Sequence, residues 1–145
     1  MIYLIALLFI ILFVTTISLH NIQNKKFLNL KGIPLSLKFP LNLNLTETKN
    51  YVLCLSTECA RCNQIVDEII HLGYPTTNVY IAFIENENTI DEYIKNKDTL
   101  NFDIIKNMTK ENLYIENTPF MYVLNEEGRI IDKGILKDTK YLEIY

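Results

Sequence analysis

The chain has 145 residues, a formal net charge of −3 and a hydrophobic content of 49%. This length fits one domain with a sizeable core. The slightly acidic balance excludes a broad basic surface of the kind that binds nucleic acid, so we expect no nucleic-acid partner. All three cysteines fall within residues 54–62, whereas secreted scaffolds held by disulfides spread their cysteines through the chain.

The chain begins with the apolar stretch "MIYLIALLFIILFVTTISL", which carries no charged side chain. At 1.5 Å per residue, a helix over this stretch is about 28 Å long, close to the ~30 Å hydrocarbon core of a bilayer. We therefore expect residues 1–20 to form a transmembrane anchor. The alternative is a cleaved signal peptide, but no basic region precedes the stretch and no clear small-x-small cleavage site follows it.

Residues 21–32 are expected to be a polar juxtamembrane linker between the anchor and a domain at residues 33–145. Three lysines, Lys25, Lys26 and Lys31, follow the apolar stretch, and only the amino terminus precedes it. Taken literally, the positive-inside rule would place the domain in the cytoplasm, although the bias is only a few charges.

The segment "IPLSLKFPLNLNL" (33–45) alternates between apolar and other residues. Period two is typical of extended chain with one buried face. Two prolines, Pro34 and Pro40, interrupt the pattern, and a proline cannot donate a ladder hydrogen bond. The sequence therefore predicts an edge strand or a broken pair of short strands here.

The remainder of the domain shows short apolar runs of strand type, separated by apolar residues at helical spacing. Gly128 suits the turn of a hairpin. The order predicts an α/β fold in which helices cover both faces of a mixed central sheet. Strands are expected at residues 51–56, 78–85, 119–124 and 129–136, and helices are expected up to residues 73–75, at 89–107 with a break near 97–101, and at the chain end.

The spacing of Cys54, Cys59 and Cys62 matches the first three ligands of a plant-type [2Fe–2S] site. Such a site needs a fourth thiolate, and the chain has no fourth cysteine. A structural zinc site needs four cysteine or histidine ligands. Only His20, at the membrane end, and His71, near a helix end, are available. Neither metal site is favoured, and no metal ligand is predicted.

A redox interpretation uses only the tetrapeptide Cys59-Ala60-Arg61-Cys62, at the junction of a buried strand and a helix. Amide groups at a helix start favour the anionic form of the first thiol, and the thiolate is the nucleophile of disulfide exchange. The second thiol can then resolve a mixed disulfide. Arg61 adds a nearby positive charge. Cys54, between two leucines, is interpreted as a small buried hydrophobe.

The stretch "VLCLSTECARCNQIV" and the later "ENTPFMYVLNEEGRIIDKGIL" together resemble the thioredoxin superfamily over residues 33–145. The chain is most similar to membrane-tethered extracytoplasmic members of the MauD, TlpA and ResA types. The resemblance implies a thioredoxin-like fold. It also implies that the Thr118-Pro119 bond is cis and faces the two cysteines.

The function implied by this resemblance is that of a membrane-tethered thiol–disulfide oxidoreductase. Cys59 would attack and Cys62 would resolve, while the backbone at Thr118 and Pro119 would bind an extended segment of a cysteine-containing protein or peptide. No metal or organic cofactor is required. The resemblance leaves open whether the protein reduces, oxidises or isomerises disulfides.

The sequence departs from thioredoxin around the motif. Glu58 stands where a tryptophan usually precedes the first cysteine, and "YVLCL" has no evident counterpart of thioredoxin's buried acid. Glu58 and Arg61 carry opposite charges, so both are expected to tune the pKa of Cys59. The segment between Cys62 and Pro119 is longer than in thioredoxin, which suggests an added helix around 89–107.

Two further possibilities compete with an enzyme. One is a non-catalytic thioredoxin-like module that delivers copper or scaffolds an assembly in the membrane. The other is a domain whose cysteines form a static disulfide. Members of this type usually face outward, where disulfides persist, so we expect a single-pass membrane protein with an extracytoplasmic domain, against the lysine bias.

Overall fold

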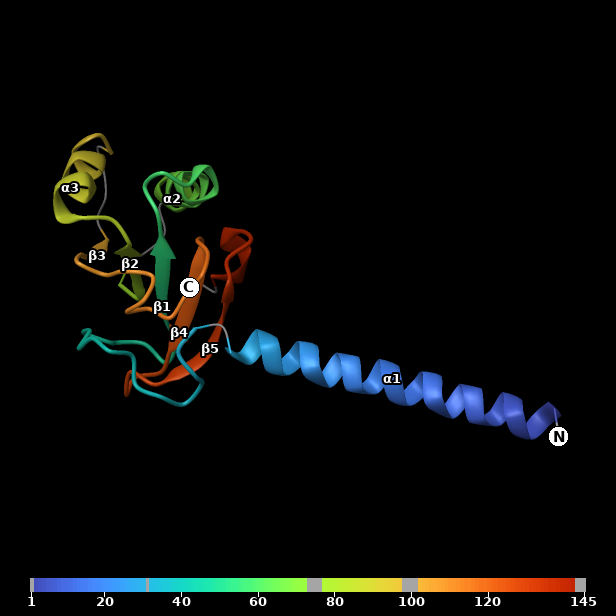
Figure 1. The fold of residues 1–145 in the computed structure, drawn as a ribbon. Helices are drawn as coiled ribbons and strands as arrows, with labels where there is room; N and C mark the ends of the chain where they lie inside the picture. The colour runs from blue at the N-terminus through green and yellow to red at the C-terminus, as the bar shows by residue number, and fades with distance from the viewer. Residues whose placement is uncertain (1, 31, 73–76, 98–101, 143–145) are drawn as a thin grey trace. The chain divides into compact units, whose positions relative to one another are not determined.

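The computed structural model describes residues 2–30, 32–72, 77–97 and 102–142, without the side chains of residues 2–5, 21–30 and 72. The chain divides into two compact units, Met1–Lys31 and Gly32–Tyr145. The first unit is the single helix α1 (Ile2–Leu30), and the second is an α/β domain (Figure 1).

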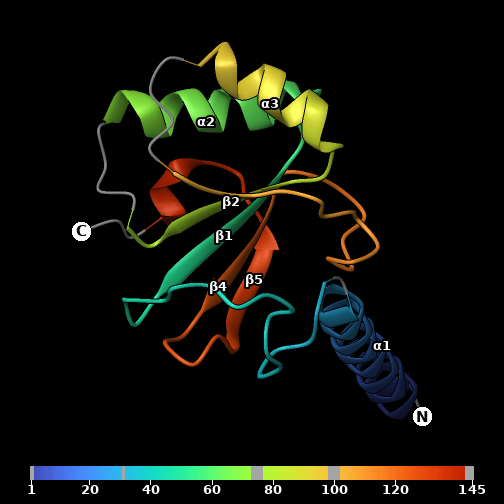
Figure 2. The same ribbon diagram turned by 90° about the vertical axis from the view of Figure 1, so that its left-hand side faces the viewer.

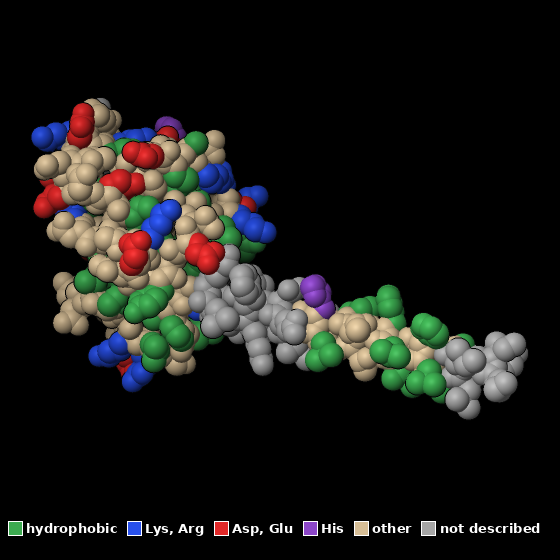
Figure 3. Space-filling model, viewed as in Figure 1, with side chains coloured by type: hydrophobic (Ala, Val, Ile, Leu, Met, Phe, Trp, Pro, Cys, Tyr) green, Lys and Arg blue, Asp and Glu red, His purple; other side chains and the backbone are tan. Residues whose placement is uncertain are grey.

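Helix α1 extends through most of the segment predicted as a linker, because residues 21–30 contain neither glycine nor proline. Its described side chains, at residues 6–20, are all exposed, and many are apolar (Figure 3). Within the part of the chain that the structure describes, no helix has both the length and the apolarity needed to cross a membrane. This finding does not support the transmembrane helix predicted over residues 1–20.

In the described part of the second unit, the strands form one mixed sheet in the order β3-β2-β1-β4-β5. Strand β1 pairs in parallel with β2 and antiparallel with β4, while β3 is parallel to β2 and β5 is antiparallel to β4. The four longer strands agree with the predicted runs. The strands are β1 (Asn50–Leu55), β2 (Val79–Phe83), β3 (Asp103–Ile105), β4 (Phe120–Leu124) and β5 (Ile130–Ile135).

The sheet separates two hydrophobic cores. Helices α2 (Ala60–Leu72) and α3 (Glu87–Lys95) contribute to the core on one face (Figure 2), together with Leu136 and Leu142, which flank the 3-10 helix η1 (Thr139–Tyr141). The opposite core is closed by residues from 33–45 and 108–115, none of them in a helix. The prediction that helices cover both faces is therefore wrong. The second face needs only apolar side chains, and these irregular segments supply them.

The predicted strand at residues 33–45 is also wrong. Only Lys38 forms a β-bridge, with Arg129, and Ser36 adopts a positive φ of 69°. Two prolines and this left-handed residue break the ladder. The alternation still has physical meaning, because Phe39 and the leucines at 41, 43 and 45 pack into the second core.

The chain after β2 agrees with the predicted helix at 89–107 only up to the predicted break near residues 97–101. Helix α3 is short and begins after Asn86, whose side chain accepts a hydrogen bond from the N–H of Thr89. Strand β3 then pairs with β2 at the edge of the sheet. The end of the domain forms the 3-10 helix η1 in place of the predicted final helix. The predicted helix stop at residues 73–75 lies outside the described residues.

Candidate redox site

Cys59 and Cys62 lie where β1 ends and α2 begins. Strand β1 is buried along its whole length and ends at Leu55. A turn follows, in which the N–H of Cys59 donates to the carbonyl of Ser56 over 3.2 Å. Cys59 directly precedes α2, and its carbonyl accepts the N–H of Asn63 over 3.0 Å. Cys59 thus lies directly before the start of a helix and Cys62 lies in the first turn of that helix, as predicted.

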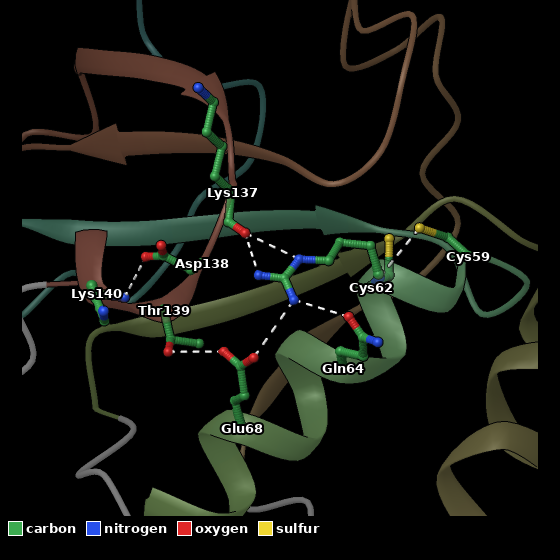
Figure 4. Close-up of polar contacts among 9 residues, drawn as sticks. Cys59, Cys62, Gln64, Glu68, Lys137, Asp138, Thr139 and Lys140 are labelled. Atoms are coloured by element: carbon green, nitrogen blue, oxygen red, sulfur yellow. Dashed lines mark hydrogen bonds and ion pairs between the residues drawn. The ribbon is translucent and has the colours of Figure 1, made fainter.

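The sulfur of Cys59 lies against the start of α2. The backbone N–H of Cys62 donates to Cys59 Sγ over 3.2 Å (Figure 4). Burial raises the pKa of the Cys59 thiol, but hydrogen bonds from the side chain and backbone of Cys62, from Thr118 and from the backbone of Arg61 outweigh it. The net effect lowers the pKa of Cys59 below its ordinary value of 9.0, so the thiolate is favoured.

Cys62 is the opposite kind of thiol. Only 1% of its surface is exposed, and it packs in the core beneath α2. Burial and, to a smaller extent, the hydrogen bond with Cys59 raise its pKa to about 11. One thiol of the pair is therefore accessible and acidic, while the other is covered and weakly acidic.

The Thr118-Pro119 peptide bond is cis, which confirms the expectation drawn from the resemblance. The bond lies beside the cysteines, because the thiol of Cys59 donates to the carbonyl oxygen of Thr118 over 3.9 Å. The side chain of Thr118 also forms hydrogen bonds that lower the pKa values of Cys59 and Cys62. The structure thus brings together four residues that the sequence analysis singled out.

Cys54 does not belong to this group. It lies on β1 with its side chain in the core of the opposite face of the sheet, next to Val52 and Tyr122. Burial strongly raises the pKa of the Cys54 thiol. Cys54 is therefore a buried hydrophobe, as predicted, and the three cysteines cannot ligate one ion together. Across the described residues, no group of three or more His, Cys, Asp or Glu side chains is placed to hold a metal.

The guanidinium of Arg61 makes its polar contacts with Lys137, Gln64 and Glu68. Both Nε and one terminal nitrogen of its guanidinium donate to the carbonyl of Lys137, with Nε at 3.0 Å. The other terminal nitrogen donates to Gln64 over 2.9 Å and lies 3.6 Å from a Glu68 carboxylate oxygen. Neither the side-chain charge of Arg61 nor that of Glu58 is among the influences on the Cys59 pKa.

No protein-family model and no curated protein matches the sequence. Several solved structures share its architecture. StoA from Bacillus subtilis is 19% identical, with a TM-score of 0.52 over 70% of this chain and 81% of StoA. The thioredoxin domain of a thiol-disulfide oxidoreductase from Bacteroides vulgatus is 13% identical, with a TM-score of 0.55 over 76% and 94%. The exposed lipoprotein thioredoxin of Streptococcus pneumoniae is 16% identical, with a TM-score of 0.52 over 66% and 82%. The second unit has a thioredoxin-like fold.

Sequence reasoning missed one residue beside the motif of this thioredoxin-like domain. Glu85 follows β2, and its Oε1 accepts both the hydroxyl of Ser56 over 2.5 Å and the N–H of Thr57 over 3.1 Å. The other oxygen, Oε2, is buried without a hydrogen-bond partner. A carboxylate directly after a buried strand parallel to β1 is a signal that the sequence did contain, since the ends of parallel strands meet at one edge.

The turn at residues 56–59 of this thioredoxin-like domain, the redox turn, has a second support, which comes from the helices. Asn63 Nδ2 donates to the carbonyl of Thr57 over 3.1 Å, and the hydroxyl of Tyr93 donates to Asn63 Oδ1 over 2.6 Å. Burial, with the nearby charges of Asp67 and Cys62, raises the pKa of Tyr93 to about 12. Tyr93 therefore remains a neutral donor at physiological pH, and α3 is tied to the turn through it.

Proposed function

We propose that the domain is a thiol–disulfide oxidoreductase that acts on cysteine-containing proteins or peptides. One observation carries the proposal: the accessible, acidic thiol of Cys59 accepts the N–H of the buried Cys62, 3.2 Å away, beside a cis Thr118-Pro119 bond. Two solved structures with this fold are named a thioredoxin and a thiol-disulfide oxidoreductase, which supports the same chemistry. The finer likeness to MauD-, TlpA- and ResA-type proteins is part of this proposal.

The reaction uses two sulfur transfers. In the reducing direction, the Cys59 thiolate attacks one sulfur of a substrate disulfide, which forms a mixed disulfide and releases a substrate thiolate. The Cys62 thiol then loses its proton and attacks Cys59 Sγ. This forms the Cys59–Cys62 disulfide and releases the second substrate thiolate. The substrate gains two electrons, and the domain loses them. The oxidising direction is the reverse.

The unequal thiols suit this order of events. Because the pKa of Cys59 is lowered, a larger fraction of it is thiolate near neutral pH than of an ordinary cysteine. Cys62 is protonated and covered, so it does not compete for the first attack. Its place in the first turn of α2 brings it next to Cys59 for the second. Cys59 is therefore proposed as the nucleophile and Cys62 as the resolving thiol.

The cis bond supplies the place for the substrate chain in this proposal. The Thr118 carbonyl lies 3.9 Å from Cys59 Sγ, and Pro119 is buried behind it. An extended peptide whose own cysteine meets Cys59 would run along the backbone at Thr118, with Glu58 exposed on the side of the motif. Glu58 is the nearest charged neighbour of Cys59 in sequence whose side chain is free to meet that peptide.

We further propose that residues 1–20 hold the domain at a membrane, with the domain on the extracytoplasmic side. This part rests on the sequence, in which residues 1–19 carry no charged side chain. The exposure of the apolar side chains on α1, such as Phe9 and Phe13, is in keeping with a lipid environment. Labelling intact cells with a membrane-impermeant maleimide tests it: labelling of Cys59 without lysis supports this topology, and labelling only after lysis contradicts it.

The proposed reaction is tested by trapping its intermediate. In a Cys62→Ser chain, the mixed disulfide at Cys59 cannot be resolved, so it should accumulate on cellular proteins and disappear on reduction. Cys59→Ser is the matched control and should trap nothing. Cys54→Ala should behave like the native chain, since Cys54 lies across the sheet.

A redox titration of the native domain completes the test. The enzyme should show a reversible two-electron couple in the physiological range. A Cys62→Ser chain that forms no mixed disulfide with any protein would contradict the proposal. Copper that copurifies at one equivalent, and is lost in Cys59→Ser, would instead identify a binding module.

A further inference from the structure

We propose that the Glu85 carboxylate is the positioning group of the redox turn, and that it holds Ser56 and Thr57 so that Cys59 Sγ meets the amides at the start of α2. The proposal deepens the proposed function, because it assigns a second residue to the same site. Its physical content concerns only the geometry of the thiol, so it can be tested without a substrate.

The contacts form a short chain from Glu85 to Cys59. Glu85 Oε1 accepts two hydrogen bonds, from Ser56 Oγ over 2.5 Å and from the N–H of Thr57 over 3.1 Å. The hydroxyl oxygen of Ser56 accepts the N–H of Glu58 over 3.3 Å, and its carbonyl accepts the N–H of Cys59 over 3.2 Å. A single carboxylate oxygen of Glu85 thus fixes Ser56, whose carbonyl accepts the hydrogen bond from the N–H of Cys59.

Ser56 also touches the second thiol. A hydrogen bond from the backbone of Ser56 to the sulfur lowers the pKa of Cys62 against the effect of burial. Movement of Ser56 would therefore displace groups that face both sulfurs. On the other side of the turn, Asn63 holds the carbonyl of Thr57. The Thr57 residue is consequently fixed at its N–H by Glu85 and at its carbonyl by Asn63.

The unpartnered oxygen indicates that this carboxylate is not there for stability alone. Glu85 Oε2 is buried and has no hydrogen-bond partner among the described residues. Burying a carboxylate oxygen without a partner is unfavourable, and a buried charge is weak evidence of stabilisation. The other oxygen, Oε1, accepts two hydrogen bonds. The arrangement leaves Oε2 without a partner in the described part of the chain and is well suited to fixing two donors of the turn.

The test is the pH dependence of Cys59 alkylation by iodoacetamide, with the modified residue identified by peptide mass spectrometry. Glu85→Ala removes the acceptor, so the hydrogen bonds to Cys59 Sγ should lose their alignment. The midpoint, which is the pH at which the alkylation rate is half of its maximum, should rise by about one pH unit. This is the effect of losing roughly one hydrogen bond to a thiolate. The rate constant below the midpoint should fall about tenfold. Ser56→Ala should shift the midpoint in the same direction by less, because Thr57 keeps its bond.

Glu85→Gln separates geometry from charge. Its amide oxygen can accept from both Ser56 and Thr57, so positioning through hydrogen bonds predicts a midpoint close to that of the native chain. A midpoint in Glu85→Gln as high as in Glu85→Ala would overturn the proposal. It would show that the negative charge of Glu85, and not its hydrogen-bond acceptor, sets the alkylation midpoint of Cys59.

Asn50→Ala is the matched control for a purely structural effect. Asn50 is buried, lies at the opposite end of β1 from the turn, and also has a buried oxygen, Oδ1, without a hydrogen-bond partner. Thermal unfolding should show that Asn50→Ala and Glu85→Ala both lower stability, but only Glu85→Ala should move the midpoint. Equal midpoints in the native, Glu85→Ala and Ser56→Ala chains overturn the proposal.

Two features keep this test decisive. If Glu85→Ala does not fold, Ser56→Ala still tests the same contact from the other side, and an unchanged midpoint there overturns the proposal. The assay also uses no disulfide substrate. A native chain with an acidic Cys59 that never exchanges with disulfides would defeat the proposed function, yet a shifted midpoint in Glu85→Ala would still support the positioning role.

Discussion

The backbone N–H of Cys62 donates a hydrogen bond to the sulfur of Cys59 over 3.2 Å. This contact requires Cys59 to sit just before α2 and Cys62 to sit in its first turn, which a two-residue spacing allows. The same geometry buries Cys62 beneath the helix and leaves Cys59 partly exposed. A single local arrangement therefore makes one thiol acidic and the other resistant to ionisation.

The side chain of Cys62 should lower the pKa of Cys59 separately from the backbone of Cys62. Cys62→Ala removes the thiol that donates to Cys59 Sγ and leaves the N–H in place, so the pKa of Cys59 should rise. We expect a rise of about one unit, the size of one hydrogen bond to a charged acceptor. Cys62→Ser keeps a donor and should raise it less. Alkylation rates across pH 5–10 measure both, and identical profiles for the two variants would argue against a side-chain contribution.

Arg61→Ala should leave the pKa of Cys59 unchanged, although the sequence suggests a charge effect. The guanidinium is held by the Lys137 carbonyl, Gln64 and Glu68, and only the backbone of Arg61 lowers the pKa of Cys59. Alanine keeps that N–H. The variant should instead loosen the segment after β5, with a loss of about 1 kcal/mol in the free energy of unfolding. Alkylation profiles and urea unfolding measure the two effects.

Glu68→Gln serves as the control for Arg61→Ala. The amide keeps an oxygen for the Thr139 hydroxyl, which Glu68 Oε2 accepts over 3.0 Å, and removes only the exposed ion pair with Arg61. Its stability should therefore lie within about 0.5 kcal/mol of the native chain. An alkylation midpoint that rises in Arg61→Ala would restore the interpretation of Arg61 as a charge that tunes the thiol.

The strand–turn–helix that carries the motif could be predicted because its signals are local. A buried apolar run, a break at residues 56–59 and helical spacing after Cys62 lie within one short segment. The separate role of Cys54 was predicted from its place between Leu53 and Leu55, and the structure puts its side chain on the other face of the sheet from theirs. The place of Thr118-Pro119 came from the resemblance and not from the residue pattern.

The groups that hold the turn join distant parts of the chain, and of these only Glu85, which follows a buried strand, left a signal in the sequence. Glu85 lies 29 residues from Ser56, and Lys137 lies 76 residues from Arg61. Neither partner follows from periodicity. The segment 33–45 failed for a different reason: two prolines prevent the hydrogen bonding that would make it a strand. Its alternation predicted the packing of Ile33, Phe39 and the leucines at 41, 43 and 45, whereas Leu35 and Leu37 are exposed.

The stability of the reduced domain should fall as the pH rises above about 9. Burial raises the pKa values of Cys54 and Cys62 above the ordinary 9.0. Above that pH the unfolded chain loses these protons while the folded chain keeps them, so the unfolded state is favoured. Each group should contribute a loss of about 1 kcal/mol between pH 9 and 10, and the slope approaches ~1.4 kcal/mol per pH unit at higher pH. Urea unfolding at pH 7, 9 and 10 under reducing conditions measures the slope.

Cys54→Ala isolates the contribution of one of these thiols. The variant leaves a small cavity that lowers stability at every pH, so the comparison must use slopes and not absolute values. Between pH 9 and 10 its stability should decline by about 1 kcal/mol less than that of the native chain, because the unfolded thiol is only half ionised at pH 9. Parallel slopes would show that the Cys54 thiol does not remain protonated in the folded domain.

Substitution by alanine should lower the stability of the domain at Gly32 and leave it nearly unchanged at Gly134. Gly32 has a φ of +80°, and a Cβ there would lie 2.6 Å from Tyr122 Oη and 3.1 Å from Phe120 Cζ. The Tyr122 hydroxyl cannot easily retreat, because it accepts the N–H of Ile33 over 2.8 Å and donates to the carbonyl of Leu113 over 2.5 Å. Left-handed backbone strain and overpacking together predict a loss of about 2–4 kcal/mol for Gly32→Ala.

At Gly134, on β5, an added Cβ meets no atom within 4 Å. Gly134→Ala should therefore keep the stability within about 0.5 kcal/mol of the native chain. Chemical denaturation of the two variants compares them directly, and neither should move the alkylation midpoint of Cys59, since both positions lie outside the contacts of the redox turn. If Gly32→Ala is as stable as Gly134→Ala, the Tyr122 hydroxyl does not fix the start of the domain against the sheet.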